Sequence, residues 1–186
     1  MLAAIDVTDI RIETERLIIR PWYQSDLEDF FAYASVEGVG EMAGWAHHEN
    51  REKTQDILNS FIDHKKTFAL ELKETGQVIG SLGIEGFQEE DFLSSALQGR
   101  EIGYVLSKEH WGKELMPEAV RAVVKYCFDI LGYDFLLCAH FVRNHQSRRV
   151  IEKSGFRFVK DIEHETRFET IEPTKLYVLY HPDLER

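Results

Sequence analysis

The feature that most constrains the fold is a ten-residue run at positions 133–142, YDFLLCAHFV. Nearly every residue in this run is apolar, whereas a strand with one face in water would alternate apolar and polar residues. The run has the pattern of a strand that is buried on both faces. We therefore expect it to lie inside a sheet that is covered by other layers of secondary structure.

Six further segments predict strands, because their apolar residues alternate with polar ones or they are rich in β-branched and aromatic types. They are residues 9–22, 67–72, 77–87, 100–107, 156–165 and 174–181. The first is expected to bulge around Thr14 and to end at Pro21. A Thr-Gly pair in residues 73–76 suits a hairpin turn, and the polar segment 88–99 is expected to be a loop.

Four segments predict helices, since their apolar residues recur at three- and four-residue spacing. They are residues 25–35, 50–66, 115–131 and 144–155. Ser25 followed by Glu28 fits a capping box, Gly132 would end the third helix, and Asn144 would cap the fourth. The order of elements predicts an α/β or α+β layered fold around a mixed sheet, as one domain over residues 1–186.

The net charge of the chain indicates which kinds of molecule it can bind. The 186 residues carry a formal net charge of -11, which disfavours nucleic acid and favours cationic partners such as amines, although it also serves solubility. No basic leader with an apolar core begins the chain and no 18 apolar residues run together, so we expect neither a signal peptide nor a membrane span. Cys127 and Cys138 lie in apolar segments, which fits buried free thiols in a reducing cytoplasm.

The segment HWGKELMPEA, residues 110–119, opens the third predicted helix with a glycine turn. The first amides of a helix have no partner within it, and the helix dipole places partial positive charge there, so such an end can hold phosphate. Gly112 would let the backbone approach closely, and Lys113 adds a cation. A glycine that opens a helix is also common as a plain turn residue.

The chain resembles the GNAT acetyltransferases, most closely the ribosomal-protein N-terminal acetyltransferase branch of RimJ and RimL. The resemblance rests on four fragments in the family's order and spacing, and it covers nearly the whole chain. They are TERLIIRPW at 14–22, EIGYVLSKEHWGK at 101–113, MPEAVRAVVKY at 116–126 and NHQSRRVIEKSGFRF at 144–158. The resemblance implies a mixed, mostly antiparallel sheet with one splayed pair of strands, flanked by about four helices.

The resemblance also implies a slot for acetyl-CoA between the splayed strands, with no metal. The residues implied in binding acetyl-CoA are Val105, Leu106, Gly112, Lys113, Glu114, Leu115, Met116, Asn144, Ser147, Arg148 and Lys153. Main-chain groups of Val105 and Leu106 would pair with the pantetheine arm, and residues 112–116 would wrap the pyrophosphate. Asn144 could instead be only a helix cap, and Arg148 and Lys153 could lie on a solvated face of the helix.

Glu114 departs from the family pattern, which has glycine or alanine at this position. Two unit charges 4 Å apart at an effective dielectric of about 20 repel by roughly 4 kcal/mol, which would abolish useful binding. Either the carboxylate points to solvent, paired with Lys113 or Arg121, or the phosphate cradle is impaired.

Acetyl transfer to an amine needs a neutral nucleophile, a polarised carbonyl and a proton for the leaving thiolate. Glu101 or Glu85 could accept the amine's proton, directly or through water. Ser147, by the family motif, would protonate the departing thiolate. No cysteine is placed for a covalent intermediate, so we expect direct attack in a ternary complex.

The sequence therefore predicts a cytoplasmic N-acetyltransferase that uses acetyl-CoA to modify a primary amine: a protein N-terminus, a polyamine or another small amine. The alternative is a regulatory domain of the same fold that binds CoA weakly or not at all. His47 and His48 lie where relatives shape the acceptor pocket, and they lack a third partner for a metal. The acceptor and the oligomeric state, including a homodimer, stay open.

Overall fold

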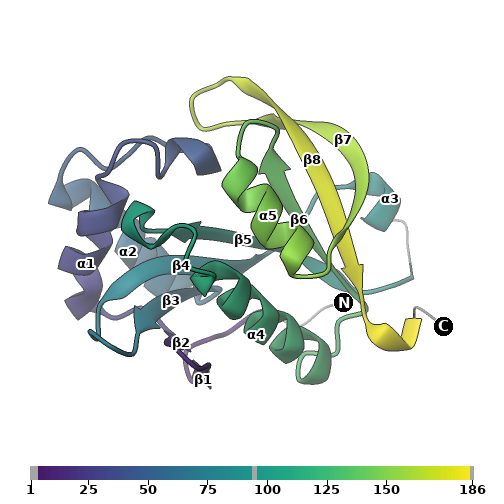
Figure 1. Cartoon of the computed structure of the whole chain (residues 1–186), viewed down its shortest axis with the longest axis horizontal. Helices are drawn as coiled ribbons and strands as arrows, with labels where there is room; N and C mark the ends of the chain where they lie inside the picture. The colour runs from purple at the N-terminus through teal and green to yellow at the C-terminus, as the bar shows by residue number, and fades with distance from the viewer. Residues whose placement is uncertain (1–3, 94–95, 185–186) are drawn as a thin grey trace.

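The computed structural model describes residues 4–93 and 96–184. One eight-stranded sheet runs through these residues in the order β1-β2-β3-β4-β5-β6-β8-β7 (Figure 1). The strands are β1 (Ile12–Glu13), β2 (Leu17–Arg20), β3 (Thr67–Leu72), β4 (Val78–Glu85), β5 (Gly99–Leu106), β6 (Phe135–Phe141), β7 (Arg157–Glu165) and β8 (Ile171–Tyr180). Neighbours are antiparallel except β5 and β6, which are parallel. The mixed, mostly antiparallel sheet is therefore confirmed.

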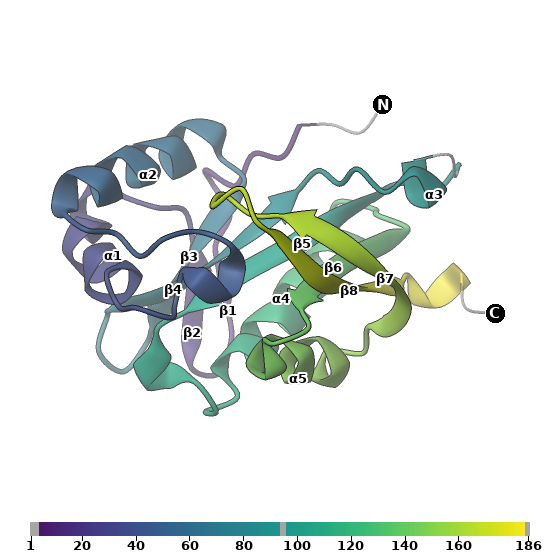
Figure 2. The ribbon, with the colours of Figure 1, turned by 90° about the horizontal axis from the view of Figure 1, so that it is seen from above.

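Helices cover both faces of the sheet, as Figure 2 shows from above. The helices α1 (Leu27–Ala34) and α2 (Arg51–His64) pack on β3 and β4, while α4 (Leu115–Asp129) and α5 (His145–Lys153) lie on the opposite face. The run at 133–142 contains β6, four of whose residues are at most 1% exposed. This burial on both faces is what its apolar pattern predicts.

Three local predictions are wrong. The segment 9–22 forms two short strands rather than one bulged strand, with Thr14 in the turn between them. The predicted loop at 88–99 contains a single helical turn, α3 (Glu90–Leu93). The Ser25 cap is replaced by a 3-10 turn at Gln24–Asp26, after which α1 begins at Leu27.

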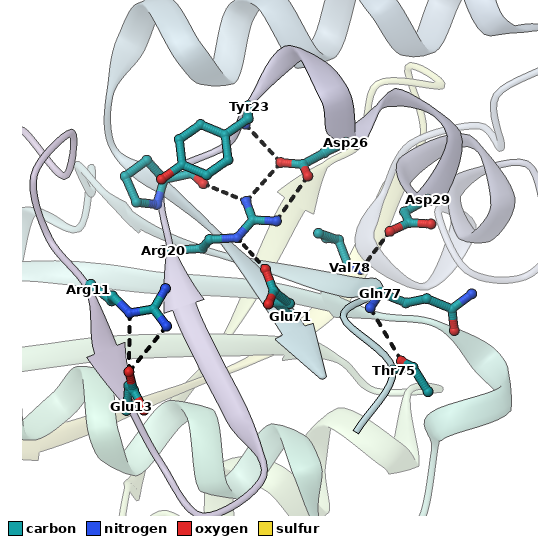
Figure 3. A network of polar contacts seen from close by, with 11 residues as sticks. Arg11, Glu13, Arg20, Tyr23, Asp26, Asp29, Glu71, Thr75, Gln77 and Val78 are labelled. Atoms are coloured by element: carbon teal, nitrogen blue, oxygen red, sulfur yellow. Dashed lines mark hydrogen bonds and ion pairs between the residues drawn. The ribbon is translucent and has the colours of Figure 1, made fainter. Parts of the chain in front are cut away.

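A buried ion pair explains where α1 begins (Figure 3). Both terminal nitrogens of Arg20 donate to Asp26 at 2.9 Å, and its Nε donates to Glu71 on β3 at 2.6 Å. The Arg20 and Asp26 side chains are 8% and 7% exposed. Asp26 also accepts the amide of Tyr23 at 2.8 Å, which closes the 3-10 turn, and α1 begins after it without a side-chain cap. The predicted capping partner, Glu28, binds Arg51 on α2 instead.

The parallel pairing of β5 with β6 is short. In the described residues it runs from Gly99 opposite Phe135 to Glu101 opposite Leu137. Beyond that point β5 continues along β4 and β6 continues along β8, so the two strands separate. The splayed pair implied by the resemblance is therefore present, and it opens next to Glu101.

Gly99 determines how closely the two strands approach at the base of this fork. An ideal Cβ on Gly99 would lie 2.5 Å from ring carbons of Phe135. That ring is fully buried and is held by Phe87, Phe92 and Tyr180, so it has little room to move.

We expect Gly99→Ala to lower the free energy of unfolding by about 1–3 kcal/mol, because the added methyl group overpacks the fork. The matched control is Gly103→Ala on the same strand, where an added Cβ meets no atom within 4 Å. Urea unfolding of both variants measures the difference. Equal stability of the two would show that the fork tolerates the methyl group.

Candidate active site

A cavity of about 330 Å³ lies in the open fork between β5 and β6. Its walls come from the ends of both strands, the start of α4, one side of α5 and the 3-10 turn Glu41–Ala43. Most of the residues predicted to bind acetyl-CoA line this cavity. They are Val105, Leu106, Gly112, Glu114, Leu115, Met116, Asn144, Ser147 and Lys153.

Two predicted cations do not line the cavity. Arg148 turns along its own helix to Glu152 at 2.8 Å, and Arg149 lines the cavity instead. Lys113 is exposed and lies outside the lining. On α5 the predicted residues Ser147 and Lys153 line the cavity, and only Arg148 is replaced, by its neighbour Arg149.

Alternate residues of β5 direct their main-chain N–H and C=O groups toward β4 or into the gap between β5 and β6. Ser107 donates its amide to Ile79 of β4 at 2.7 Å, so Val105, two residues earlier, also faces β4. A Cβ on Gly80 of β4 would lie 2.4 Å from the Val105 carbonyl oxygen, which agrees with this direction. Tyr104 and Leu106 therefore direct their main-chain groups into the gap. This replaces the expected pair Val105 and Leu106 by Tyr104 and Leu106.

The start of α4 points at the same cavity. Glu114 is its N-cap and has a left-handed backbone, with φ of 62°, and Gly112 also has a positive φ of 74°. The amides of Leu115 and Met116 lie in the first turn, before the first partners within the helix, and Pro117 has none. This end of the cavity has the donors and the dipole that phosphate requires.

Glu114 forms an ion pair with Lys153 at the end of α5, rather than with Lys113 or Arg121. Both side chains are about half exposed. The hydrogen bond from Lys153 lowers the pKa of Glu114, so the carboxylate stays ionised with its charge balanced by the ammonium group. The pair joins the two helices that border the cavity.

Of the two candidate carboxylates, the structure brings only Glu101 into the cavity lining. Burial, followed by the charges of Glu89 and Glu85, raises its pKa to about 7. Glu85 stands opposite Glu101 in the β4–β5 register but is paired with Lys66 outside the cavity. A group with a pKa near 7 can accept and release a proton at neutral pH.

Ser147 is held by two neighbours. Its amide donates to the side-chain oxygen of Asn144 at 3.0 Å, which confirms Asn144 as the cap of α5. Its hydroxyl lies 2.9 Å from the hydroxyl of Tyr104, whose pKa burial raises well above its usual value. Tyr104 therefore stays protonated beside Ser147. The sequence interpretation missed Tyr104, although strand alternation placed it on the face opposite Glu101.

The other candidate groups lie outside the cavity or are inert. His48 is buried against Thr54 at 2.9 Å, and His47 pairs with Glu41, so neither ring lines the cavity. Burial raises the pKa of Cys127 to about 12 and that of Cys138 further, which keeps both thiols protonated. Within residues 4–93 and 96–184 no cluster of metal-ligating side chains occurs, and no helix is long and apolar enough to cross a membrane.

Comparison with known proteins identifies the family. Residues 16–157 match the model of the acetyltransferase (GNAT) domain, so the chain belongs to the GNAT acetyltransferases. It is 34% identical over 142 residues to a Bacillus subtilis protein named "Probable N-acetyltransferase YjcK", an alignment that covers 72% of this chain and 70% of the relative. These matches support an acetyltransferase enzyme.

Solved structures share the fold. A GNAT-family acetyltransferase from Bacillus anthracis superposes with a TM-score of 0.79 at 22% identity, covering 92% of this chain and 98% of that one. The ribosomal-protein-S5-alanine acetyltransferase of Vibrio fischeri superposes with a TM-score of 0.72 at 19% identity, covering 94% and 98%. At these identities the likeness concerns the fold.

Glu101 should make the stability of the fold depend on pH. Its pKa rises from 4.5 to about 7 on folding, so its contribution is complete below about pH 4.5 and is lost as the pH rises through 7. Glu101→Gln cannot ionise. We expect it to gain on the order of 1–3 kcal/mol relative to the wild type between pH 4.5 and 8.

Urea unfolding at a series of pH values measures this difference. Glu109→Gln, which removes an exposed carboxylate, is the control and should follow the wild type. A gap between Glu101→Gln and the wild type that does not change with pH would mean that Glu101 ionises equally in the folded and unfolded chains.

Proposed function

We propose that this protein is an acetyl-CoA-dependent N-acetyltransferase that modifies a primary amine by direct attack in a ternary complex. The observation that carries the proposal is the fork between β5 and β6, which joins a helix N-terminus to a partly buried carboxylate within one cavity. Acetyl-CoA supplies an activated acetyl thioester.

The residues at the α4 end of the cavity fit the cofactor. The gap-facing main chain of Tyr104 and Leu106 would bind the pantetheine arm as an added strand, although the Leu106 carbonyl already accepts the indole N–H of Trp111 at 2.8 Å. The amides of Leu115 and Met116 would hold the pyrophosphate. Lys153 and Arg149 both line the cavity, and we assign to them the neutralisation of the phosphate charge.

Glu101 is the proposed base. It takes a proton from the incoming ammonium group, which leaves a neutral nitrogen to form the new bond to the acetyl carbon. An α-amine with a pKa near 8 is about a tenth neutral at pH 7, so a base with a pKa near 7 is well matched to it. As the carbon–sulfur bond breaks, Ser147 would protonate the thiolate, and the second proton that the attacking nitrogen loses would return to Ser147 through solvent. The Tyr104 hydroxyl, which stays protonated, holds the Ser147 hydroxyl at 2.9 Å.

The acceptor class follows from the relatives and from charge. The Vibrio fischeri relative is named for the alanine of a ribosomal protein, which favours the RimJ/RimL branch and a protein N-terminus for this chain. A polyamine or another small amine fits the acidic net charge of -11 as well. Location in the cytoplasm and a single domain over 1–186 belong to the same proposal.

The alternative is a regulatory domain that binds CoA weakly because Glu114 repels phosphate. The ion pair between Glu114 and Lys153 argues against it, since the carboxylate already has a counter-charge at the edge of the cavity.

A free-thiol assay with a panel of amines tests the function. We expect thiol release only when acetyl-CoA and an amine are both present, together with thermal stabilisation of about 2.7 kcal/mol at a hundredfold excess of acetyl-CoA over its dissociation constant. Glu101→Gln should remove the rise in rate around pH 7, and Ser147→Ala should lower turnover. The absence of stabilisation would support the regulatory alternative, and stabilisation without thiol release from any amine would contradict the proposed activity.

Glu114→Gly tests the role of the unusual residue. Because Lys153 balances the carboxylate, we expect the affinity for acetyl-CoA to change by less than about tenfold, or roughly 1.4 kcal/mol. Calorimetry at two salt concentrations measures it, with Glu109→Gly as a control for losing one exposed negative charge. A gain of a hundredfold or more would show that Glu114 obstructs the cradle.

A further inference from the structure

We propose that Arg143 and Asn144, in the turn between β6 and α5, form a clamp that holds the 3-10 turn Glu41–Ala43 over the acceptor end of the cavity. The clamp thereby positions the wall that selects the acceptor. This inference rests on the proposed function, which assigns one end of the cavity to the acceptor and the other to acetyl-CoA. The clamp itself consists of hydrogen bonds that the structure records.

Arg143 forms one half of the clamp. Its Nη2 donates to the carbonyl oxygen of Glu41 at 2.8 Å and to Oε1 of Glu172 on β8 at 3.0 Å. Its Nε donates to the same carboxylate at 3.1 Å, and the guanidinium lies 5.3 Å from the centre of the Phe141 ring. The planar guanidinium thus ties the Glu41–Ala43 turn to the far strands of the sheet.

Asn144 forms the other half with a single amide group. Its Nδ2 donates to the carbonyl oxygen of Met42 at 3.1 Å, while its Oδ1 accepts the amide of Ser147 at 3.0 Å. Both ends of the side chain are therefore used within the protein. One residue links the Glu41–Ala43 turn to the helix that carries the proposed acid.

The Glu41–Ala43 turn is also held from other sides. The amide of Arg167, in the β7–β8 hairpin, donates to the carbonyl oxygen of Gly44 at 3.0 Å. Figure 2 shows the hairpin tip beside this part of the chain. The Glu41 carboxylate accepts the amides of Gly38 at 2.7 Å and His47 at 3.1 Å, which closes the surrounding loop on itself.

Strand alternation identifies the face of the sheet on which the acceptor would bind, and the clamped turn lies on that face. Cys138 of β6 packs in the core beneath α4, and Ala139 points to the opposite face. On β5, Val105 packs with the α1–α2 core, so Glu101 shares that opposite face. Met42 lines the cavity from the Glu41–Ala43 turn, away from the α4 end where the cofactor is proposed to bind.

Two substitutions weaken the clamp while they preserve the cap of α5. Asn144→Asp keeps an oxygen to accept the Ser147 amide but removes the N–H group that reaches Met42. Arg143→Lys keeps the charge beside Glu172 but removes the fork. We expect each to raise KM for the acceptor about three- to tenfold, the effect of one hydrogen bond, with KM for acetyl-CoA within about twofold of the wild type.

Arg51→Lys is the matched control. Arg51 also forks onto a glutamate, Glu28, and its guanidinium lies 4.7 Å from the centre of the Phe31 ring, but it is outside the cavity lining. Both KM values of this variant should equal those of the wild type. Unchanged acceptor KM in Asn144→Asp and Arg143→Lys would overturn the clamp, and so would a rise confined to acetyl-CoA, which would assign Asn144 to the cofactor.

Hydrogen exchange gives a readout that does not need activity. Amides of residues 38–48 should exchange faster in Asn144→Asp and Arg143→Lys than in the wild type and Arg51→Lys, because the loop has lost a tether. If the wild type releases no thiol with any amine, the proposed function fails while this measurement still tests the clamp. Equal exchange in all four proteins would overturn the clamp whatever the activity.

Discussion

The separation of β5 from β6 is the constraint on which the rest of the site depends. A parallel pair requires a crossover, and here α4 supplies it, so the N-terminus of α4 must return close to the end of β5. Because β6 then follows β8 while β5 follows β4, the fork exposes main-chain groups that no neighbouring strand satisfies. One topological feature thus brings unpaired main-chain groups, a helix dipole and Glu101 into one cavity.

Charge in this acidic protein is arranged in local pairs. Arg20 with Asp26 holds the entry to α1, and Lys153 with Glu114 joins α4 to α5. The buried pair carries more structural weight, since removing one partner from such a pair costs about 3–5 kcal/mol, whereas exposed pairs contribute little. Glu101 differs from these paired carboxylates, because burial and like charges hold its pKa near neutrality, and that makes it suited to proton transfer.

Periodicity predicted the elements that have one buried face or two, and Asn144 caps its helix as its residue type suggests. Periodicity and capping signals failed where tertiary contacts override them, as at Ser25. That residue lies in a 3-10 turn that Asp26 closes by accepting the Tyr23 amide while its carboxylate pairs with Arg20. The family motifs named Ser147 and Gly112, and both residues line the cavity. Tyr104 and Met42 were missed because their roles arise from residues distant in the sequence, which no local pattern encodes.

The contact between Gly99 and Phe135 also sets the register of β5 against β6. Side chains on a strand alternate between faces, so a slip of β5 by one residue would turn Glu101 toward α4 and Tyr104 away from Ser147. A slip by one residue would bring Gln98 or Arg100 against the Phe135 ring in place of Gly99. Both of these residues have a Cβ, for which the ring leaves no room. Gly99 thereby fixes the register of β5 and keeps the side chains of Glu101 and Tyr104 on opposite faces of the strand.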